Sequence, residues 1–364
     1  NKQKKCSFVI GTHEIANYMF SLKSIFKDQA ISVNLAVNKF YAKNKYDYAI
    51  KSKNKYLTYI VRIFYGPYLL AKLSNQADVF IYIWSTGFCL DREIDYKFLK
   101  KKKKKIVCIF LGSDIRSHKL RIDHHTKNDL DTGSNYTAEI INILKREIIV
   151  KKVALLADQY ADLIFGHPKD QPSYLKSVQY PVPYIYGARH SQCNEEKFNN
   201  LDEIIVVHAS TSPLTKGTPL VRAAIKKLKI EGYRFKYIEL FNAPNEDLLK
   251  TLEKSHIVLS QFYAFALGVF SVEGMAYSNA VITSADYDGF SENQNNAWLR
   301  TKYWEVYENT KYLLDNPEKI KNYANNGFKF VKKNFREEQV KKYYIDSFYN
   351  NKIIDDKNIF AKRS

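Results

Sequence analysis

The sequence between Ile204 and Thr218 reads IIVVHASTSPLTKGT. It begins with a short apolar run, typical of a buried parallel strand, and continues with small and hydroxyl-bearing residues. A Lys216-Gly217 pair follows, and a helical pattern begins at about Pro219. Hydroxyl donors, one lysine and the free N–H groups of a helix N-terminus together suit a bound diphosphate. These residues therefore predict a phosphate-binding loop at the end of a parallel strand.

Short apolar runs alternate with longer helical patterns along the whole chain, which indicates strand–helix–strand units and parallel sheets. The expected strands are 6–10, 31–37, 77–84, 106–111, 162–166, 204–209, 234–240, 257–260 and 280–283. Helical patterns cover residues 14–26 and 136–161. From Thr310 to Tyr349 the pattern predicts two helices, interrupted at the Asn-Asn-Gly sequence of residues 325–327.

The chain has 364 residues, which is more than one compact core organises and suits two domains. Four prolines between residues 168 and 183 break the alternating pattern and mark a linker. The predicted fold class is therefore α/β, with a Rossmann-like, doubly wound domain at 1–180 and a second one at 181–330. Such sheets bind ligands at the carboxyl ends of their strands, so we expect a cleft where the two domains face each other.

The composition of the chain bears on the cellular compartment of the protein. No run of eighteen uncharged apolar residues is present, which excludes a transmembrane helix, and no secretory signal is recognisable. The four cysteines are widely spaced and match no metal or redox pattern, which fits a reducing compartment. A cytoplasmic location is expected.

The positive charge is concentrated in the first half of the chain. The net charge is +19; residues 1–185 hold 31 basic and 16 acidic residues, a balance of +15, which leaves +4 for the rest. Such asymmetry favours an anionic partner: nucleic acid, an anionic membrane surface or an anionic substrate. The lysine run at 100–105 lacks the interleaved aromatic residues of nucleic-acid sites, so we interpret it as a solvated or membrane-facing loop.

Residues 56–73 combine aromatic and aliphatic side chains with Arg62 and Lys72. One interpretation is an amphipathic segment that lies in a membrane interface, with its tyrosine rings at the level of the lipid headgroups. The alternative is an ordinary buried helix, broken at Gly66-Pro67. The surrounding positive charge favours membrane contact.

A second motif reads AFALGVFSVEGMA over residues 264–276 and precedes an apolar strand. Gly268 would open a tight loop at a helix N-terminus, and Glu273 would lie about one turn inside that helix. A carboxylate among apolar, small residues needs a partner if it is buried, and the vicinal hydroxyls of a ribose would provide one. The alternative for Glu273 is an exposed helix residue.

Together these two motifs resemble the donor-binding half of GT-B glycosyltransferases, most closely the retaining family-4 enzymes of bacterial surface-polysaccharide synthesis. The resemblance implies that Lys216 contacts the donor diphosphate, that Gly268 and Val269 donate backbone N–H groups, and that Glu273 binds the ribose. It also implies a C-terminal helix, residues 331–364, that crosses back to the first domain. The donor-binding residues expected on these grounds are Gly11, Ser210, Thr211, Lys216, Gly217, Gly268, Val269 and Glu273.

The first domain carries two further segments that resemble this family. Residues 105–116 end a strand in a Gly-Ser-Asp loop that is similar to the family's H-G-x-D loop, with Leu111 where a histidine often stands. Asp114 and His118 are therefore candidate catalytic groups beside Lys216, and Arg116 a candidate acceptor-binding group. The alternative for Asp114 is a helix cap or an arginine partner.

The second segment, Gly11-Thr12-His13-Glu14, resembles the glycine loop near the donor phosphates. His13 is a candidate acceptor-binding residue. His13 and Glu14 fit equally well as acceptor-site groups and as residues that start a helix.

The sequence departs from the family pattern at several positions. Phe265 stands where the first glutamate of the family's E-x7-E pattern is expected, and the arginine usual in the phosphate loop is missing. Because of these departures, the sequence does not identify the donor sugar. No metal is expected: His124-His125 is an adjacent pair, and the D-x-D sequence at 286–288 suits a donor-side loop better than a metal site.

The resulting prediction is a retaining, metal-independent glycosyltransferase without a cofactor. It would use a nucleoside-diphosphate sugar and a glycan acceptor. It would act at the inner face of the cytoplasmic membrane, in capsule, O-antigen or lipooligosaccharide synthesis. Its partners would be a lipid-linked acceptor and an anionic membrane surface, and no nucleic acid is expected. The alternatives are a sugar-nucleotide epimerase built from two Rossmann-like domains and a basic nucleic-acid-binding protein.

Overall fold

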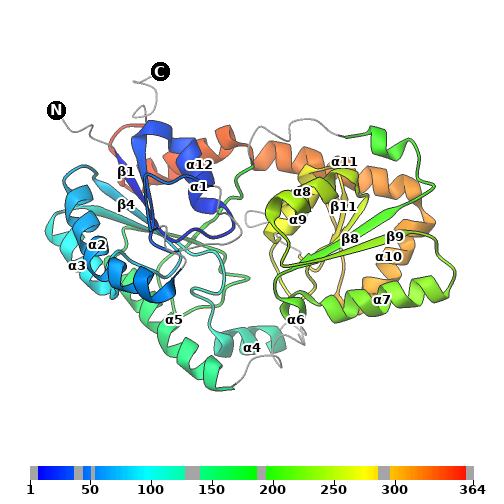
Figure 1. The fold of residues 1–364 in the computed structure, drawn as a ribbon, viewed down its shortest axis with the longest axis horizontal. Helices are drawn as coiled ribbons and strands as arrows, with labels where there is room; N and C mark the ends of the chain where they lie inside the picture. Colours follow the sequence, from blue (N-terminus) through cyan, green and yellow to red (C-terminus); the bar gives the residue numbers. More distant parts are fainter. Residues whose placement is uncertain are drawn as a thin grey trace. The chain divides into compact units, whose positions relative to one another are not determined.

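The computed structural model describes residues 7–36, 44–50, 54–127, 140–186, 194–285 and 296–357. These residues form two compact units. Unit 1 contains the chain up to Arg121, Ile143–Ile185 and the part from Glu337 onward, and unit 2 contains Ile122–Asn142 and Tyr186–Arg336. Each unit is built on a parallel sheet with helices packed against it, which confirms the predicted α/β class (Figure 1).

Seven strands form the sheet of unit 1, in the order β3-β2-β1-β4-β5-β6-β7. Their bounds are β1 Phe8–Thr12, β2 Ala30–Asn34, β3 Tyr48–Ala49, β4 Val79–Ile83, β5 Lys105–Ile109, β6 Leu163–Gly166 and β7 Tyr180–Pro181. β1 and β4 are buried along their whole length, as their unbroken apolar runs require. Strand order reverses between β1 and β4, and open α/β sheets bind ligands at such a switch point.

Helices cover both faces of this sheet. They are α1 Tyr18–Phe26, α2 Lys55–Ser74, α3 Arg92–Lys101, α5 Ile140–Tyr160 and α12 Glu337–Asn350, while α4, His118–Lys127, begins in unit 1 and ends in unit 2. α2, α3 and α5 share one apolar core with the sheet, and α1 and α12 share another.

The last helix, α12, belongs to unit 1 together with the first part of the chain. In α12, Tyr344 and Phe348 are fully buried among the aromatic rings of Phe26 and Phe165. The Tyr344 hydroxyl also hydrogen-bonds that of Tyr18 in α1. Removing these aromatic side chains from water is what holds the end of the chain on this sheet.

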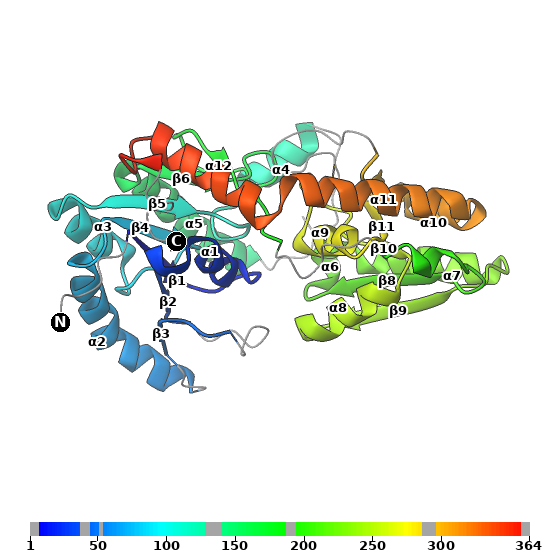
Figure 2. The same ribbon diagram turned by 90° about the horizontal axis from the view of Figure 1, so that it is seen from above.

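Five strands form the sheet of unit 2, in the order β12-β11-β10-β8-β9 (Figure 2). Their bounds are β8 Ile205–Ser210, β9 Lys236–Phe241, β10 Ile257–Leu259, β11 Ala280–Thr283 and β12 Leu299–Arg300. The helices are α6 Pro213–Lys216, α7 Thr218–Ile230, α8 Asn245–Lys254, α9 Val269–Ala276, α10 Val306–Asp315 and α11 Pro317–Asn334.

Two predicted helix breaks are wrong. α11 continues through residues 325–327, and α2 continues through Gly66-Pro67. A Cβ on Gly327 would lie 2.8 Å from the Ala297 carbonyl oxygen, and one on Gly66 would lie 2.0 Å from that of Phe88. Both glycines therefore allow a close approach between a helix and a neighbouring backbone, and neither ends its helix.

The described residues bear on what the composition led us to expect about membrane-spanning helices and cysteines. None of their helices is long and apolar enough to cross a membrane. Cys89 and Cys108 are free thiols, and both are buried.

Candidate functional site

The predicted phosphate loop lies at the carboxyl end of β8. The hydroxyl of Ser210 accepts a hydrogen bond from the backbone N–H of Ser212 at 3.0 Å, and the neighbouring Thr211 is exposed. Lys216 ends the short helix α6, and Gly217 then adopts a φ of 80°, with the position of a Cβ only 3.3 Å from Phe262. A glycine is required there because the left-handed backbone and the close contact both disfavour a side chain.

His208 connects β8 to β10 and to the start of α7, and no sequence motif predicted this role. Its Nδ1 lies 2.8 Å from the Leu259 carbonyl oxygen, so Nδ1 carries the proton. Nε2 then accepts from the hydroxyl of Thr218 at 2.8 Å. Burial lowers the pKa of His208 and keeps the ring neutral. The sequence could have indicated this role, because His208 is a polar residue in the middle of an otherwise apolar strand.

Gln261 connects the two donor motifs and was also missed. Its side-chain oxygen accepts a hydrogen bond from Nζ of Lys216, and its Nε2 donates to the Ala266 carbonyl oxygen at 2.9 Å. A Cβ on Gly268 would lie 3.0 Å from the same side-chain oxygen. Lys216 and the Gly268 turn, more than fifty residues apart in sequence, therefore meet through one glutamine at the carboxyl end of β10.

Helix α9 begins directly after Gly268, with Val269 as its first residue. Its carboxylate Glu273 accepts a hydrogen bond from Nδ2 of Asn245 at 2.9 Å. Burial raises the pKa of Glu273 to about 7, and the bond from Asn245 opposes that rise. The side chain is partly buried, so the fully exposed alternative does not apply.

Phe265 occupies the position at which the family resemblance leads us to expect a glutamate. Its ring packs edge-on against His124, with 4.9 Å between the ring centroids. An aromatic ring cannot accept the hydrogen bonds of sugar hydroxyls as a carboxylate does. This position therefore offers an apolar surface.

In unit 1, the end of β1 meets the loop that follows β4. The Thr12 hydroxyl lies 2.9 Å from that of Thr86 and donates to the Gly87 carbonyl oxygen at 3.2 Å. His13 stacks on Trp84, and its buried Nδ1 has no hydrogen-bond partner among the residues that the structure describes. An unsatisfied buried nitrogen at a topological switch point is a candidate ligand contact.

The flanking residues Gly11 and Glu14 have structural contacts of their own. A Cβ on Gly11 would lie 3.0 Å from the Val33 carbonyl oxygen of the adjacent strand. The Glu14 carboxylate accepts from the N–H groups of Met19 and Phe20, at 3.1 and 2.9 Å, and from the Tyr46 hydroxyl at 2.9 Å. Glu14 thus stabilises the start of α1, in agreement with its reading as a helix-start residue.

Asp114 organises the loop after β5. Its carboxylate accepts from the backbone N–H groups of Gly112 at 2.8 Å and Leu111 at 3.3 Å. Burial raises its pKa to about 6, although these two bonds and Arg116 favour the charged form. His118 starts α4, and its backbone N–H donates to Glu147 at 3.1 Å.

Three arginines gather beside this loop: Arg116, Arg121 and Arg146, which we call the arginine cluster. Arg116 donates through Nε to the Asp170 carbonyl oxygen at 2.8 Å and also pairs with the Asp170 carboxylate, while Arg146 donates to the Ser113 carbonyl oxygen. Burial lowers the pKa of Arg121 to about 10, and repulsion by Arg116 adds to that effect. Burial and Arg116 also lower the pKa of Arg146.

The arginine cluster lowers the pKa of the neighbouring histidines as well. Burial has the largest effect on the pKa of His118, followed by Arg146 and Arg121. Burial takes the pKa of His167 to about 4; Arg116 contributes to that fall and Asp170 opposes it. Both imidazoles are therefore neutral at pH 7. Arg121 and Arg146 belong to none of the sequence motifs, so no local signal pointed to them.

The structure thus places Ser210, Thr211, Lys216, Gly217, Gly268, Val269 and Glu273 in unit 2, and Gly11, His13, Asp114, Arg116 and His118 in unit 1. Among the described residues, no group of three His, Cys, Asp or Glu side chains is suited to hold a metal ion. The D-x-D sequence at 286–288 lies outside the described residues.

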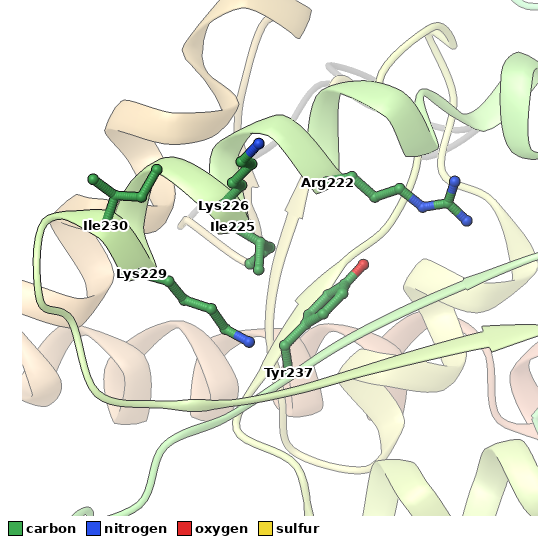
Figure 3. A pocket seen from close by; sticks show the side chains of 6 residues that line it. All are labelled: Arg222, Ile225, Lys226, Lys229, Ile230 and Tyr237. Carbon is green, nitrogen blue, oxygen red and sulfur yellow. The ribbon is translucent and has the colours of Figure 1, made fainter.

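A hollow of about 390 Å³ lies elsewhere in unit 2, between α7 and β9 (Figure 3). Its lining consists of Arg222, Ile225, Lys226, Lys229, Ile230 and Tyr237. It shares no residue with the predicted donor site.

No family model matches this sequence, and no curated protein matches it. Solved structures do match. An α-glucosyltransferase in complex with UDP and a 13-mer DNA has a TM-score of 0.59 at 12% identity, with 94% of this chain and 99% of that chain covered. WaaG, a glycosyltransferase involved in lipopolysaccharide biosynthesis, has a TM-score of 0.54 at 11% identity, over 90% and 95% of the two chains.

MnaA from S. aureus, solved with UDP, matches with a TM-score of 0.54 at 13% identity, over 97% of this chain and 98% of that chain. At such identities the likeness concerns the fold. The likeness extends over 90% or more of this chain and of each of these neighbours. The chain has the GT-B fold of glycosyltransferases.

Proposed function

We propose that this protein transfers a sugar from a nucleoside-diphosphate donor to a glycan acceptor. One observation carries the proposal: Lys216 is joined through Gln261 to the Gly268 turn at the carboxyl edge of the unit 2 sheet. A lysine, a helix N-terminus and a carboxylate one turn further on are the groups that a nucleoside diphosphate requires. Two of the structural neighbours were solved with UDP, which supports this ligand class.

Each donor group has a separate role in this proposal. The ammonium of Lys216 supplies the positive charge and N–H donors that bind a phosphate oxygen. The amides that open α9 at Gly268 and Val269, together with the hydroxyls of Ser210 and Thr211, bind the remaining oxygens. Gly217 keeps the loop close to the diphosphate, and Glu273 accepts from the ribose hydroxyls.

The reaction follows from these contacts. The bond between the anomeric carbon and the phosphate oxygen breaks, and the acceptor oxygen bonds to the same face of that carbon, which retains the configuration. The acceptor proton passes to the leaving phosphate, whose negative charge is stabilised by Lys216 and the loop amides. Asp114 and His118 orient the reacting groups. No protein-bound metal or cofactor enters this scheme.

The arginine cluster supports an acceptor that carries phosphate groups. Guanidinium groups bind phosphate through paired hydrogen bonds, and a bound anion would relieve the repulsion among the three arginines. Arg116 belongs to that cluster, and His13 lies at the neighbouring switch point. A lipid-linked glycan on the inner face of the cytoplasmic membrane, as used in capsule, O-antigen or lipooligosaccharide synthesis, has this chemistry and brings an anionic membrane surface as partner.

The test is a thermal-unfolding series with UDP, GDP, CDP and dTDP. A ligand at about 100 times its Kd adds roughly 2.7 kcal/mol of stability, which raises the unfolding midpoint measurably. We expect one nucleotide to do so, and to lose the effect in Lys216→Ala. If none of the four raises the midpoint, the donor site is refuted. Product analysis without acceptor then separates a transferase from the epimerase alternative. Steep salt-dependent affinity for DNA or RNA, without nucleotide binding, would favour the nucleic-acid-binding alternative.

A further inference from the structure

The outer face of helix α2 exposes an unusual number of large apolar side chains. The exposed fractions are Tyr56 84%, Leu57 50%, Tyr59 56%, Ile60 54%, Ile63 38%, Phe64 75% and Tyr68 57%. We call these seven residues the α2 face. Soluble monomers rarely expose apolar groups contiguously on this scale, and such patches mark interaction sites.

The α2 face forms one continuous side of the helix. Tyr56, Ile60, Phe64 and Tyr68 follow one another at intervals of four residues, so they line up along the same side. Towards its C-terminal end the helix contributes Leu69, Leu70 and Leu73 to the core of unit 1, and these are buried. Figure 2 shows α2 at the edge of unit 1, and the residues that the structure describes leave the α2 face exposed.

The charge of the sequence segment that contains α2 favours an anionic partner. Between Asp47 and Asp78 the sequence has five basic residues, Lys51, Lys53, Lys55, Arg62 and Lys72, and no acidic residue. A second copy of this chain, whose net charge is +19, would bring like charges together at the contact. An anionic bilayer offers both an apolar interior for the side chains and negative headgroups for the lysines.

The residue types of the α2 face also suit a bilayer interface. Tyrosine places an apolar ring in the hydrocarbon boundary while its hydroxyl stays among the headgroups. Lys72 lies over the rings of Tyr48 and Tyr68, at 5.1 and 5.9 Å from their centroids, at the C-terminal end of the face. The lysine run that follows α3 contributes less, because Lys100 and Lys104 form ion pairs with Asp162 and Asp78.

Helix α2 also touches the switch point of the unit 1 sheet. Arg62 points inward and donates to the Gly87 carbonyl oxygen at 2.7 Å, the same oxygen that accepts from Thr12. Its Nε is buried without a hydrogen-bond partner among the described residues, as is Nδ1 of His13. Helix α2 therefore connects its exposed outer face, through the inward-pointing Arg62, to the edge of the sheet at which we place the acceptor.

We propose that the α2 face docks unit 1 onto an anionic bilayer, with α2 lying in the interface plane, and so brings the headgroup of a lipid-linked acceptor to the edge formed by Thr12, His13 and Arg62. The docking stands on the exposed residues themselves, and only the delivery of the acceptor rests on the proposed function.

The test is binding of the full chain to sedimented vesicles of phosphatidylcholine, with and without phosphatidylglycerol. We expect binding to the mixed vesicles that weakens with salt, and at least about tenfold weaker binding after the triple substitution Tyr56→Ser, Ile60→Ser and Phe64→Ser. A matched control removes exposed apolar side chains from unit 2, with Ile230→Ser and Phe241→Ser, which are 76% and 61% exposed. This control should bind vesicles like the unaltered chain.

Undiminished binding by the triple variant would overturn the proposal. So would a dimer in solution that the triple substitution converts to a monomer, because the α2 face would then bind a second copy. The nucleotide that raises the unfolding midpoint of the unaltered chain should raise that of the triple variant equally, which shows that it is folded. If no nucleotide raises either midpoint, the donor site fails while the vesicle result still decides the docking surface.

Discussion

His208 and Thr218 are joined by a hydrogen bond of 2.8 Å between Nε2 of the imidazole and the threonine hydroxyl. His208 belongs to β8 and Thr218 starts α7, so the bond spans the phosphate loop between them. The second nitrogen of the ring holds β10 through the Leu259 carbonyl oxygen. One buried side chain thus fixes the distance between the strand, the helix and the neighbouring strand that frame Lys216.

Replacing His208 by Phe should destabilise unit 2 and weaken donor binding. The Thr218 hydroxyl would lose its partner, at a cost of about 1–3 kcal/mol, and the Leu259 carbonyl oxygen would keep only its bond within the sheet. Urea unfolding measures the loss of stability. Thr218→Val is the matched control, because it removes one hydrogen bond and keeps the shape, and it should cost about 1 kcal/mol. Equal stability of His208→Phe and the unaltered chain would contradict this account.

Gly217→Ala should lower both stability and nucleotide affinity. The φ of 80° disfavours a side chain, and the new Cβ would lie 3.3 Å from Phe262, so we expect a loss of about 1 kcal/mol or more together with a displaced Lys216.

Gly232→Ala is the control for Gly217→Ala. Gly232 has a similar φ of 89°, but nothing lies within 4 Å of its Cβ position. It should lose about 1 kcal/mol of stability and keep its nucleotide affinity. The midpoint shift with nucleotide, measured on both variants, separates the two effects. Equal nucleotide affinities in the two variants would show that Gly217 has no role in the donor site.

Local patterns predicted the elements of this fold well, and its long-range contacts poorly. The apolar runs that became β1, β4 and β8 are continuous because both faces of a parallel strand are covered. Glycine was misread in α11, because the same residue that ends a helix also permits close packing against Ala297.

In the candidate site, too, residues in local motifs were predicted and residues that act through long-range contacts were not. Lys216, Gly268 and Glu273 were found because each stands at a fixed place in a strand–loop–helix pattern. Gln261 and the arginine cluster were not found, because their importance arises only when distant segments come together. Arg121 and Arg146 are well separated in sequence, yet the charges of both lower the pKa of His118.

Nucleotide affinity should rise with pH because of Glu273. Its pKa is raised to about 7, and only the ionised carboxylate accepts from both ribose hydroxyls. Binding of the nucleotide should therefore be roughly tenfold weaker at pH 6 than at pH 8 from this group alone. Glu273→Gln should bind more weakly at pH 8 and should lack this part of the dependence. Calorimetric titrations of both proteins across this range test the prediction, and parallel profiles would exclude Glu273 from the ribose site.

Stability should fall with rising pH because of Glu14. Burial raises its pKa from the ordinary value of 4.5 to about 7, so the folded state prefers the neutral form. The stability associated with that form is present below pH 4.5 and is lost as the pH rises towards 7 and above. At about 1.4 kcal/mol per pH unit, the loss amounts to about 3 kcal/mol. Urea unfolding at pH 5 and pH 8 should show this difference for the unaltered chain relative to Glu14→Gln; an identical pH dependence of the two would refute it.

The arginine cluster should bind a phosphate group independently of the donor site. Inorganic pyrophosphate is a suitable probe, but it also fits the donor loop, so the measurement is made with the donor site saturated by the nucleotide identified above. Pyrophosphate should then raise the unfolding midpoint further at low salt, because it neutralises the repulsion among Arg116, Arg121 and Arg146. Arg146→Gln should lose most of this second rise, whereas Lys145→Gln, the same change of charge on the exposed neighbouring residue, should keep it. A second rise of equal size in both variants would mean that pyrophosphate acts through general charge screening, and the acceptor phosphate would have to bind elsewhere on unit 1.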